Sequence, residues 1–377
     1  MPEDTNSAGW SALGDAAPLS KKLGYLLQSL QANGAAVDRL AVVIYDHPSD
    51  TLKTFLSVGD DPPTLSNYQA RLADVPSLQE LVARRQLRVI GDLQVLAGSP
   101  AEHSRRLLAA GFQSSCTLPM IHDDEFFGFI FCNSRKRDYF TPAVLGQLEP
   151  ALRLFALIVI SELRTLRTLG AATATMRYLT SHRDCETGAH LGRMASYSRL
   201  IARGLAAAQG LSDEYIEHLF LFAPLHDIGK IAIPDSILLK PGVLTREEFE
   251  LMKTHTVKGR EMVDFLVHEF HLNRITHIGV MRNIVFSHHE AYDGSGYPEG
   301  LSGEAIPLEA RIVATADVLD ALASQRPYKP AWPLDIALAE LRRLAGKKLD
   351  PQCVEALLMH RGEIETIGQQ YQETVYG

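Results

Sequence analysis

The chain has 377 residues, which is long enough for two domains that each bury a core. Apolar residues make up 46% and charged residues 22%, as in ordinary globular proteins, and the formal net charge of −8 argues against a basic surface that binds nucleic-acid polymers. The four cysteines are scattered without paired spacing, at Cys116, Cys132, Cys185 and Cys353. This pattern argues against disulfides and against a thiolate zinc site, and it predicts a cytoplasmic protein.

The N-terminal residues 1–20 are mostly small and polar. They lack the basic start and the apolar stretch of a signal peptide, so we expect a disordered leader. The longest apolar run, Leu154–Ile160, is too short to cross a bilayer, and we expect no membrane contact.

A small α/β domain is predicted for residues 21–140. Leu40–Asp46 and Leu87–Leu93 have the composition of strands, and Ser114–Ser134 has the pattern of two strands joined by a polar turn at Asp123–Glu125. A helical stretch, residues 77–86, lies between them along the chain. These signals indicate a domain built on an antiparallel sheet.

A long connector helix is predicted for residues 141–172. Thr141-Pro142 is typical of a helix start, and apolar residues then recur at helical spacing at Leu145, Leu148, Leu152, Phe155, Val159, Leu163, Leu166 and Leu169. Because they occupy more than one face, we expect a homodimer in which two copies of the helix pair. The alternative is a monomer whose connector is buried against its own domains.

Residues 173–377 show helical patterns and predict an all-α domain with several candidate metal ligands. Three groups are local: Glu186 with His190, four residues apart; His226 beside Asp227, with Lys230 one turn later; and His288 beside His289. Two further candidates, His255 and Asp317, stand on separate segments. Each of these alone is more often a solvated or hydrogen-bonded residue, and other histidines, such as His103 and His218, are assigned no ligand role. Imidazoles and carboxylates without thiolates suit iron and manganese as well as zinc.

Taken together, the order and spacing of these residues resemble the HD-GYP family of metal-dependent phosphohydrolases. The resemblance covers residues 173–377 and rests on "RDCETGAHLGRM", "HDIGKIAIPDSILLKPGVLTREEFELMKTH", "HHEAYDGSGYPEGLSGEAIPLEARIVATADVLDAL" and "RPYKPA". The stretch between His255 and His288 is longer than usual in the family, which affects the rim of the pocket and not the metal centre.

This resemblance implies two metal sites that share one carboxylate. His190, His226 and Asp317 would hold one metal, His255, His288 and His289 the other, and Asp227 would bridge both. Glu186 matches a position at which some family members hold a third metal. We therefore expect two or three divalent cations, either iron or manganese.

The family substrate is cyclic di-GMP, a bacterial second messenger, and the resemblance implies residues that bind it. Asp227 and Lys230 would be catalytic, with Lys230 neutralising a phosphate or assisting the leaving oxygen. Arg326 and Lys329 would bind phosphate, and Tyr297 and Pro298 would offer flat apolar surface in a loop made tight by its glycines. Asp293 is expected to organise this loop. The implied product is linear pGpG, with GMP as a further product.

The N-terminal half resembles a GAF domain, through its strand pattern and the long helix that follows. Such a domain would regulate the catalytic half in response to a signal. We find no residue set for a bound cyclic nucleotide, haem or bilin, and we expect Cys116 to be a buried strand residue and not a cofactor anchor.

Three rival functions are left open by the sequence. A phosphodiesterase that prefers 3′,3′-cyclic GMP–AMP would differ only in residues that read the bases. A module that binds a cyclic dinucleotide and signals without turnover would have the same fold, although the complete ligand set argues against it. An HD-type di-iron oxygenase is disfavoured by Lys230, Arg326 and the glycine-rich loop.

Overall fold

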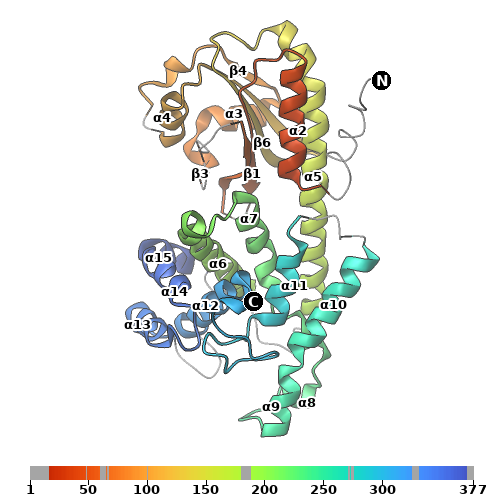
Figure 1. Cartoon of the computed structure of the whole chain (residues 1–377), viewed down its shortest axis with the longest axis vertical. Coiled ribbons are helices and arrows are strands. Elements are labelled where there is room, and N and C mark those ends of the chain that lie inside the picture. The colour runs from red at the N-terminus through yellow and green to blue at the C-terminus, as the bar shows by residue number, and fades with distance from the viewer. Residues whose placement is uncertain are drawn as a thin grey trace, which may run out of the picture. The chain divides into compact units, whose positions relative to one another are not determined.

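The computed structural model describes residues 17–47, 49–59, 65, 68–99, 101–179, 188–270, 272, 276–324 and 331–371, with the backbone alone for 169, 170 and 172–179. The chain divides into two compact units, one ending at Thr165 and the other beginning at Leu166 (Figure 1). Most of the predicted leader lies outside the described residues. Its last two positions, Leu19 and Ser20, belong instead to the helix α2 (Leu19–Ala32), in which Leu19 is fully buried.

The first unit is built on a six-stranded antiparallel sheet with the strand order β3-β2-β1-β6-β5-β4. Its strands are β1 (Arg39–Asp46), β2 (Thr51–Val58), β3 (Gln69–Arg71), β4 (Arg88–Ile90), β5 (Ser114–His122) and β6 (Glu125–Ser134). β1, β4, β5 and β6 were predicted from the sequence, whereas β2 and β3 were not. β5 and β6 meet at Asp123 and Asp124, which both have positive φ angles, as tight hairpin turns of the twisted sheet require.

Helices cover both faces of this sheet. On one face, α2 (Leu19–Ala32) and α5 (Pro142–Leu179) pack against the strands in one continuous apolar core, and Figure 1 shows these two helices side by side. On the other face lie α3 (Pro76–Arg84), the short helix η2 (Leu93–Leu96) and α4 (Glu102–Ala109), with two smaller apolar clusters. The second face is therefore less continuously packed than the first.

Helix α5 extends beyond the first unit and is apolar on two sides. Its segment Pro142–Thr168 is long and apolar enough to cross a membrane by length and composition alone, since an 18-residue window within it has a mean hydropathy of 1.7. One side, which includes Leu152 and Val159, is buried in the core of the sheet, whereas Leu154 and Leu157 on the other side are exposed. Packing against the sheet accounts for the first apolar side and leaves the second unexplained. The expected absence of membrane contact stays a prediction.

The described part of the second unit contains helices and no sheet. They are α6 (Gly188–Gln209), α7 (Asp213–Phe222), η3 (Ala223–Leu225), η4 (Ile228–Ala232), α8 (Asp235–Leu238), α9 (Arg246–Lys253), α10 (His255–Glu269), α11 (Ile278–Ser287), η6 (Gly303–Ala305), α12 (Leu308–Ala323), α13 (Leu334–Leu344), α14 (Pro351–Leu358) and α15 (Arg361–Gln370). The predicted fold class is confirmed in its architecture: the protein is a multidomain α+β protein with an N-terminal α/β domain, a long helix and a helical C-terminal domain.

Candidate metal centre

The structure brings all predicted metal ligands that it describes into two adjoining groups in the second unit. One group is Asp227, His255, His288 and His289, and the other is His190, His226 and Asp317; within each group the ligand atoms lie within 4.8 Å of one another. The groups adjoin because the ring centroids of His226 and His288 are 5.2 Å apart. Glu186, the remaining predicted ligand, lies outside the described residues.

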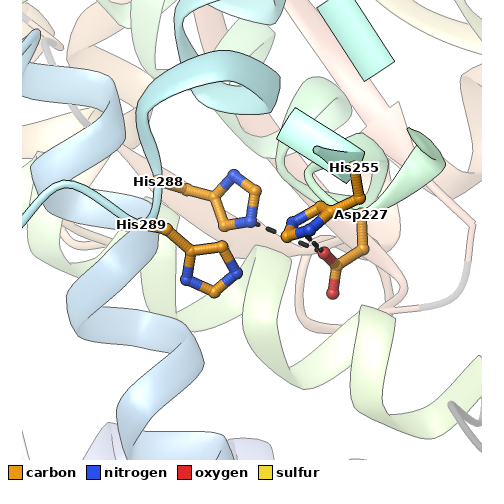
Figure 2. Close-up of side chains that lie close together, drawn as sticks. All are labelled: Asp227, His255, His288 and His289. Carbon is orange, nitrogen blue, oxygen red and sulfur yellow. Dashed lines mark ion pairs between the residues drawn. The ribbon is translucent and has the colours of Figure 1, made fainter. Parts of the chain in front are cut away.

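The ligands are placed mainly by helix ends and breaks. Asp227 and His226 lie at the break between η3 and η4, and His255 is the first residue of α10. His288 caps the C-terminus of α11, and His289 follows it. Figure 2 shows His255 and His288 meeting Asp227 from separate segments, with His289 next to His288. At such ends the chain changes direction, so several side chains approach one point from different sides.

Hydrogen bonds fix the orientation of three imidazoles. The Nδ1 atoms of His226, His255 and His288 lie 3.1, 2.8 and 2.9 Å from the backbone oxygens of Ala223, Met252 and Ile284, respectively. A carbonyl oxygen only accepts, so Nδ1 carries the hydrogen and, in the neutral ring, Nε2 presents its lone pair. Orienting a metal-binding histidine through its other ring nitrogen is a general feature of metal sites.

The carboxylate of Asp227 faces both groups. Its Oδ1 lies 3.2 Å from Nε2 of His255 and 3.5 Å from Nε2 of His288, as the dashed lines in Figure 2 show, while its Oδ2 lies 3.1 Å from Nε2 of His226. A lone pair and a carboxylate oxygen at this distance repel each other unless a cation lies between them. Ligands about 2 Å from a shared cation lie about 3 Å from one another, which fits these separations.

Three of these atoms have no hydrogen bond within the described residues. Oδ1 of Asp227 and the Nε2 atoms of His255 and His288 are buried and lack a partner. Leaving such a group unsatisfied costs about 1–3 kcal/mol. Nitrogen and oxygen acceptors aimed at one point fit a divalent cation, and the residues present therefore fit the metal that the sequence predicts.

The charge state of the site also suits a cation. Burial alone raises the pKa of Asp227, but the positive charge of Lys230 and contacts with His226 and His255 outweigh it and hold that pKa well below its usual value. Lys230 Nζ lies 2.8 Å from Oδ2 of Asp227. Burial lowers the pKa of His288 and lowers that of His289 further. The aspartate is thus anionic and these imidazoles neutral, which is the protonation that metal binding requires.

The orientation of His190 depends on a residue that the sequence analysis missed. Its Nδ1 donates to Oδ2 of Asp320 at 2.6 Å, and Nε of Arg193 donates to the other oxygen at 2.5 Å. Asp320 is 1% exposed, and burial tends to raise its pKa, but the hydrogen bonds from His190 and Arg193 outweigh burial and lower it. Asp320 stands one turn after Asp317 on α12. This second acid in "ADVLDAL" is the sequence feature that could have identified it.

A close contact between backbones brings η4 against α10. A Cβ atom on Gly229 would lie 1.9 Å from the backbone oxygen of His255 and 2.5 Å from the nitrogen of Gly259. Only glycine fits at this contact. The contact places Asp227 and Lys230 beside the start of α10. The glycine of "HDIGK" therefore positions the ligands around it.

The glycine-rich loop after His289 is held by buried and exposed carboxylates. Glu290, which is buried, accepts hydrogen bonds from the backbone nitrogens of Glu299 and Leu301 at 2.8 and 3.0 Å. Asp293 accepts one from the nitrogen of Ser295 at 2.9 Å, in agreement with its expected role in the loop. A Cβ on Gly296 would lie 2.1 Å from the nitrogen of Ala291. The loop is thus folded back tightly on the segment that carries the histidines.

Two of the predicted substrate-binding residues lie beside the metal ligands. The ring of Tyr297 is 4.8 Å from that of His289 between centroids, at an interplanar angle of 31°, and Pro298 is the next residue. Both are partly exposed, so they border the ligands at the surface. The other two, Arg326 and Lys329, lie outside the described residues.

Comparisons with known proteins match the part of the chain that carries this candidate site. Residues 185–353 match the model of the HD domain family. The chain is 48% identical over 219 residues to the cyclic di-GMP phosphodiesterase response regulator RpfG of Xanthomonas campestris pv. campestris, covering 58% of this chain and 54% of that protein. It is 41% identical over 187 residues to the 3′3′-cGAMP-specific phosphodiesterase 2 of Vibrio cholerae, covering 49% of this chain and 33% of that protein.

The chain spans about half the length, or less, of these relatives. Among solved structures it is similar to a GAF domain/HD domain protein from Geobacter sulfurreducens, with a TM-score of 0.31 and 18% identity, covering 38% of this chain and 93% of that chain.

Gly229→Ala is expected to disrupt the metal centre. The added methyl group must separate η4 from α10, and overpacking of this kind costs about 1–3 kcal/mol of stability. Metal content, measured by elemental analysis of the purified protein, should fall. Gly362→Ala is the control, because nothing lies within 4 Å of a Cβ there and helix propensity favours alanine. A Gly229→Ala variant with the metal content of the wild type would contradict the role assigned to this contact.

Asp320→Asn is expected to weaken metal binding about 10- to 100-fold, because the oriented acceptor for Nδ1 of His190 is lost. The measurement is a metal titration with a competing chelator. Asp350→Asn provides a matched control: Asp350 is equally buried and pairs with Arg311, but it contacts no predicted ligand. Both variants should lose stability, and only Asp320→Asn should lose metal affinity. Equal metal affinities for the two variants would show that Asp320 acts on stability alone.

Proposed function

We propose that the protein is a metal-dependent phosphodiesterase that hydrolyses cyclic di-GMP, and the match of residues 185–353 to the HD domain family supports this. The observation that carries the proposal is the carboxylate of Asp227, whose two oxygens face two groups of histidines. A single carboxylate shared in this way suits a pair of cations. The identity of 48% to a cyclic di-GMP phosphodiesterase supports the choice of substrate.

We assign the metal ligands as the resemblance implies. His190, His226 and Asp317 would hold one cation and His255, His288 and His289 the second, with Asp227 shared. When bound, such cations supply Lewis acidity and neutralise phosphate charge during hydrolysis. Iron or manganese suits this imidazole and carboxylate set. A third cation at Glu186 is part of the proposal, and a metal content above two per chain would support it.

The remaining site residues would bind and orient the substrate. Lys230, whose ammonium lies 2.8 Å from Asp227, places a positive charge where a phosphate approaches the centre. Arg326 and Lys329 would grip phosphate oxygens, and Tyr297 with Pro298 would lie against the body of the dinucleotide. Hydrolysis adds water to one phosphodiester, so that phosphorus gains a hydroxyl, the ribose 3′ oxygen leaves with a proton, and the ring opens to pGpG. A second hydrolysis would give GMP.

One alternative substrate has a specific observation in its favour. The chain is 41% identical to a 3′3′-cGAMP-specific phosphodiesterase over 187 residues, so 3′,3′-cyclic GMP–AMP is the second candidate. The two candidates are separated by measuring kcat/KM for both cyclic dinucleotides on one anaerobically purified, metal-loaded sample. Binding of either without turnover would instead support a signalling module.

We further propose that the protein is cytoplasmic and works as a homodimer regulated by its GAF-like domain. Leu154, Leu157 and Ile158 are 64%, 47% and 38% exposed, and their spacing along α5 places them on one face of the helix. An apolar face of this kind is covered when two copies of α5 pair. Deleting residues 1–140 tests regulation, because unchanged turnover and metal content would leave that domain without a regulatory effect.

Asp227→Ala is expected to abolish metal binding and hydrolysis together, because it removes the carboxylate that both ligand groups face. The measurements are elemental analysis and turnover of cyclic di-GMP on the same samples. Asp335→Ala is the control, since this aspartate is 72% exposed and lies on α13, away from the ligands. An Asp227→Ala protein with full activity and unchanged metal stoichiometry would exclude the proposed centre.

Leu154→Arg combined with Leu157→Arg is expected to convert a dimer into a monomer, because charges on the pairing face would have to be buried without partners. Light scattering at micromolar concentration measures the mass. Val95→Arg is the control, since Val95 is 72% exposed but lies on η2. A wild-type protein that is already monomeric under these conditions would refute the dimer.

A further inference from the structure

Helix α9 (Arg246–Lys253) contributes no buried residue to the second unit. Figure 1 shows α8 and α9 at one extremity of that unit. Phe249 is 46% exposed and Leu251 is 43% exposed, and because they are two residues apart on a helix they face nearly opposite directions. Single exposed apolar residues are common on protein surfaces, so the neighbours of each side chain decide what it does.

Phe249 is connected to the candidate metal centre through Tyr297. The ring centroids of Phe249 and Tyr297 lie 6.4 Å apart at an interplanar angle of 83°, an edge-to-face arrangement that aromatic rings favour. Tyr297 in turn packs on His289, with 4.8 Å between ring centroids. Two ring contacts therefore lead from a predicted metal ligand to an aromatic side chain that is exposed on α9.

Lys253 places a positive charge beside both of these rings. Its Nζ lies 5.1 Å from the ring centroid of Phe249 and 5.6 Å from that of Tyr297. The same Nζ lies 2.7 Å from Oε1 of Glu250, whose side chain is 61% exposed. Exposed ion pairs contribute little to stability, so another anion can replace Glu250 at small cost.

Both ends of α9 are held in place. At its start, the side chain of Thr245 accepts from the backbone nitrogen of Glu248, and the side chain of Glu248 accepts from that of Thr245. At its end, the backbone oxygen of Met252 accepts the hydrogen bond that orients His255. Phe249 and Lys253 are thus presented at a fixed place relative to the metal centre, which lowers the entropic cost of binding a ligand there.

On the basis of the proposed function, on which this step rests, we infer that Phe249 and Lys253 bind the part of the cyclic dinucleotide that the metal centre does not hold. Phe249 stacks on one base, and Lys253 pairs with the phosphodiester that is not cleaved. Every base has a flat π face that stacks on aromatic side chains, and an ammonium group suits a phosphate. Because stacking tolerates any base, these residues serve cyclic di-GMP and 3′,3′-cyclic GMP–AMP alike.

The test is steady-state kinetics of the metal-loaded, full-length protein with both cyclic dinucleotides. Phe249→Ala should raise KM about 5- to 100-fold for each, as expected for the loss of one base stack. Lys253→Gln should raise KM about tenfold, as expected for the loss of one charged hydrogen bond. Inhibition by inorganic phosphate, which is small enough to occupy the metal centre alone, and metal content should equal those of the wild type in both variants.

Matched controls should keep the wild-type KM. They are Leu251→Ala, on the opposite side of α9, and Lys258→Gln, whose lysine pairs with Glu261 three residues away at 3.0 Å, much as Lys253 pairs with Glu250.

Three results would count against these roles. Turnover of a cyclic dinucleotide by the wild type, with an unchanged KM in Phe249→Ala or Lys253→Gln, would overturn this inference and leave the proposed function standing. A variant that loses metal or phosphate inhibition along with substrate affinity would show that α9 only supports the metal centre, and would overturn the inference too. A metal-loaded wild type that turns over neither cyclic dinucleotide would overturn the proposed function and the inference with it.

Discussion

The second unit of the molecule is organised around one buried carboxylate. Asp227 is 8% exposed and its two oxygens face histidines from different helices, at 3.1 to 3.5 Å. In surroundings of low dielectric constant such a charge interacts strongly with everything near it, so small displacements of the surrounding helices are costly. The break between η3 and η4, the start of α10 and the end of α11 must therefore meet at one place. Gly229 permits that meeting by letting two backbones touch.

The same requirement explains how the histidines are oriented. His226, His255 and His288 each bond through Nδ1 to a carbonyl three or four residues earlier, so the local backbone that ends a helix also fixes the ring. The positions three and four residues before His190 lie outside the described residues. The acceptor for its Nδ1 that the structure shows is Asp320, 130 residues away in the chain. A side-chain carboxylate thus replaces the carbonyl that the other histidines use.

The sequence reveals groups of neighbouring candidate ligands more readily than it reveals residues that support a ligand from far along the chain. Ligands that are adjacent or a few residues apart, such as His226 with Asp227 and His288 with His289, were predicted because their spacing is local. Asp320 was missed because its partner is distant in sequence, although it stands one turn from Asp317. Strand β2 was missed because Lys53 interrupts its apolar pattern; this lysine is buried through an ion pair of 2.6 Å with Asp46.

The charge at the candidate metal centre determines what can bind there. Around Asp227 the acceptors outnumber the donors: an anionic carboxylate and imidazole lone pairs converge, and only cations satisfy them.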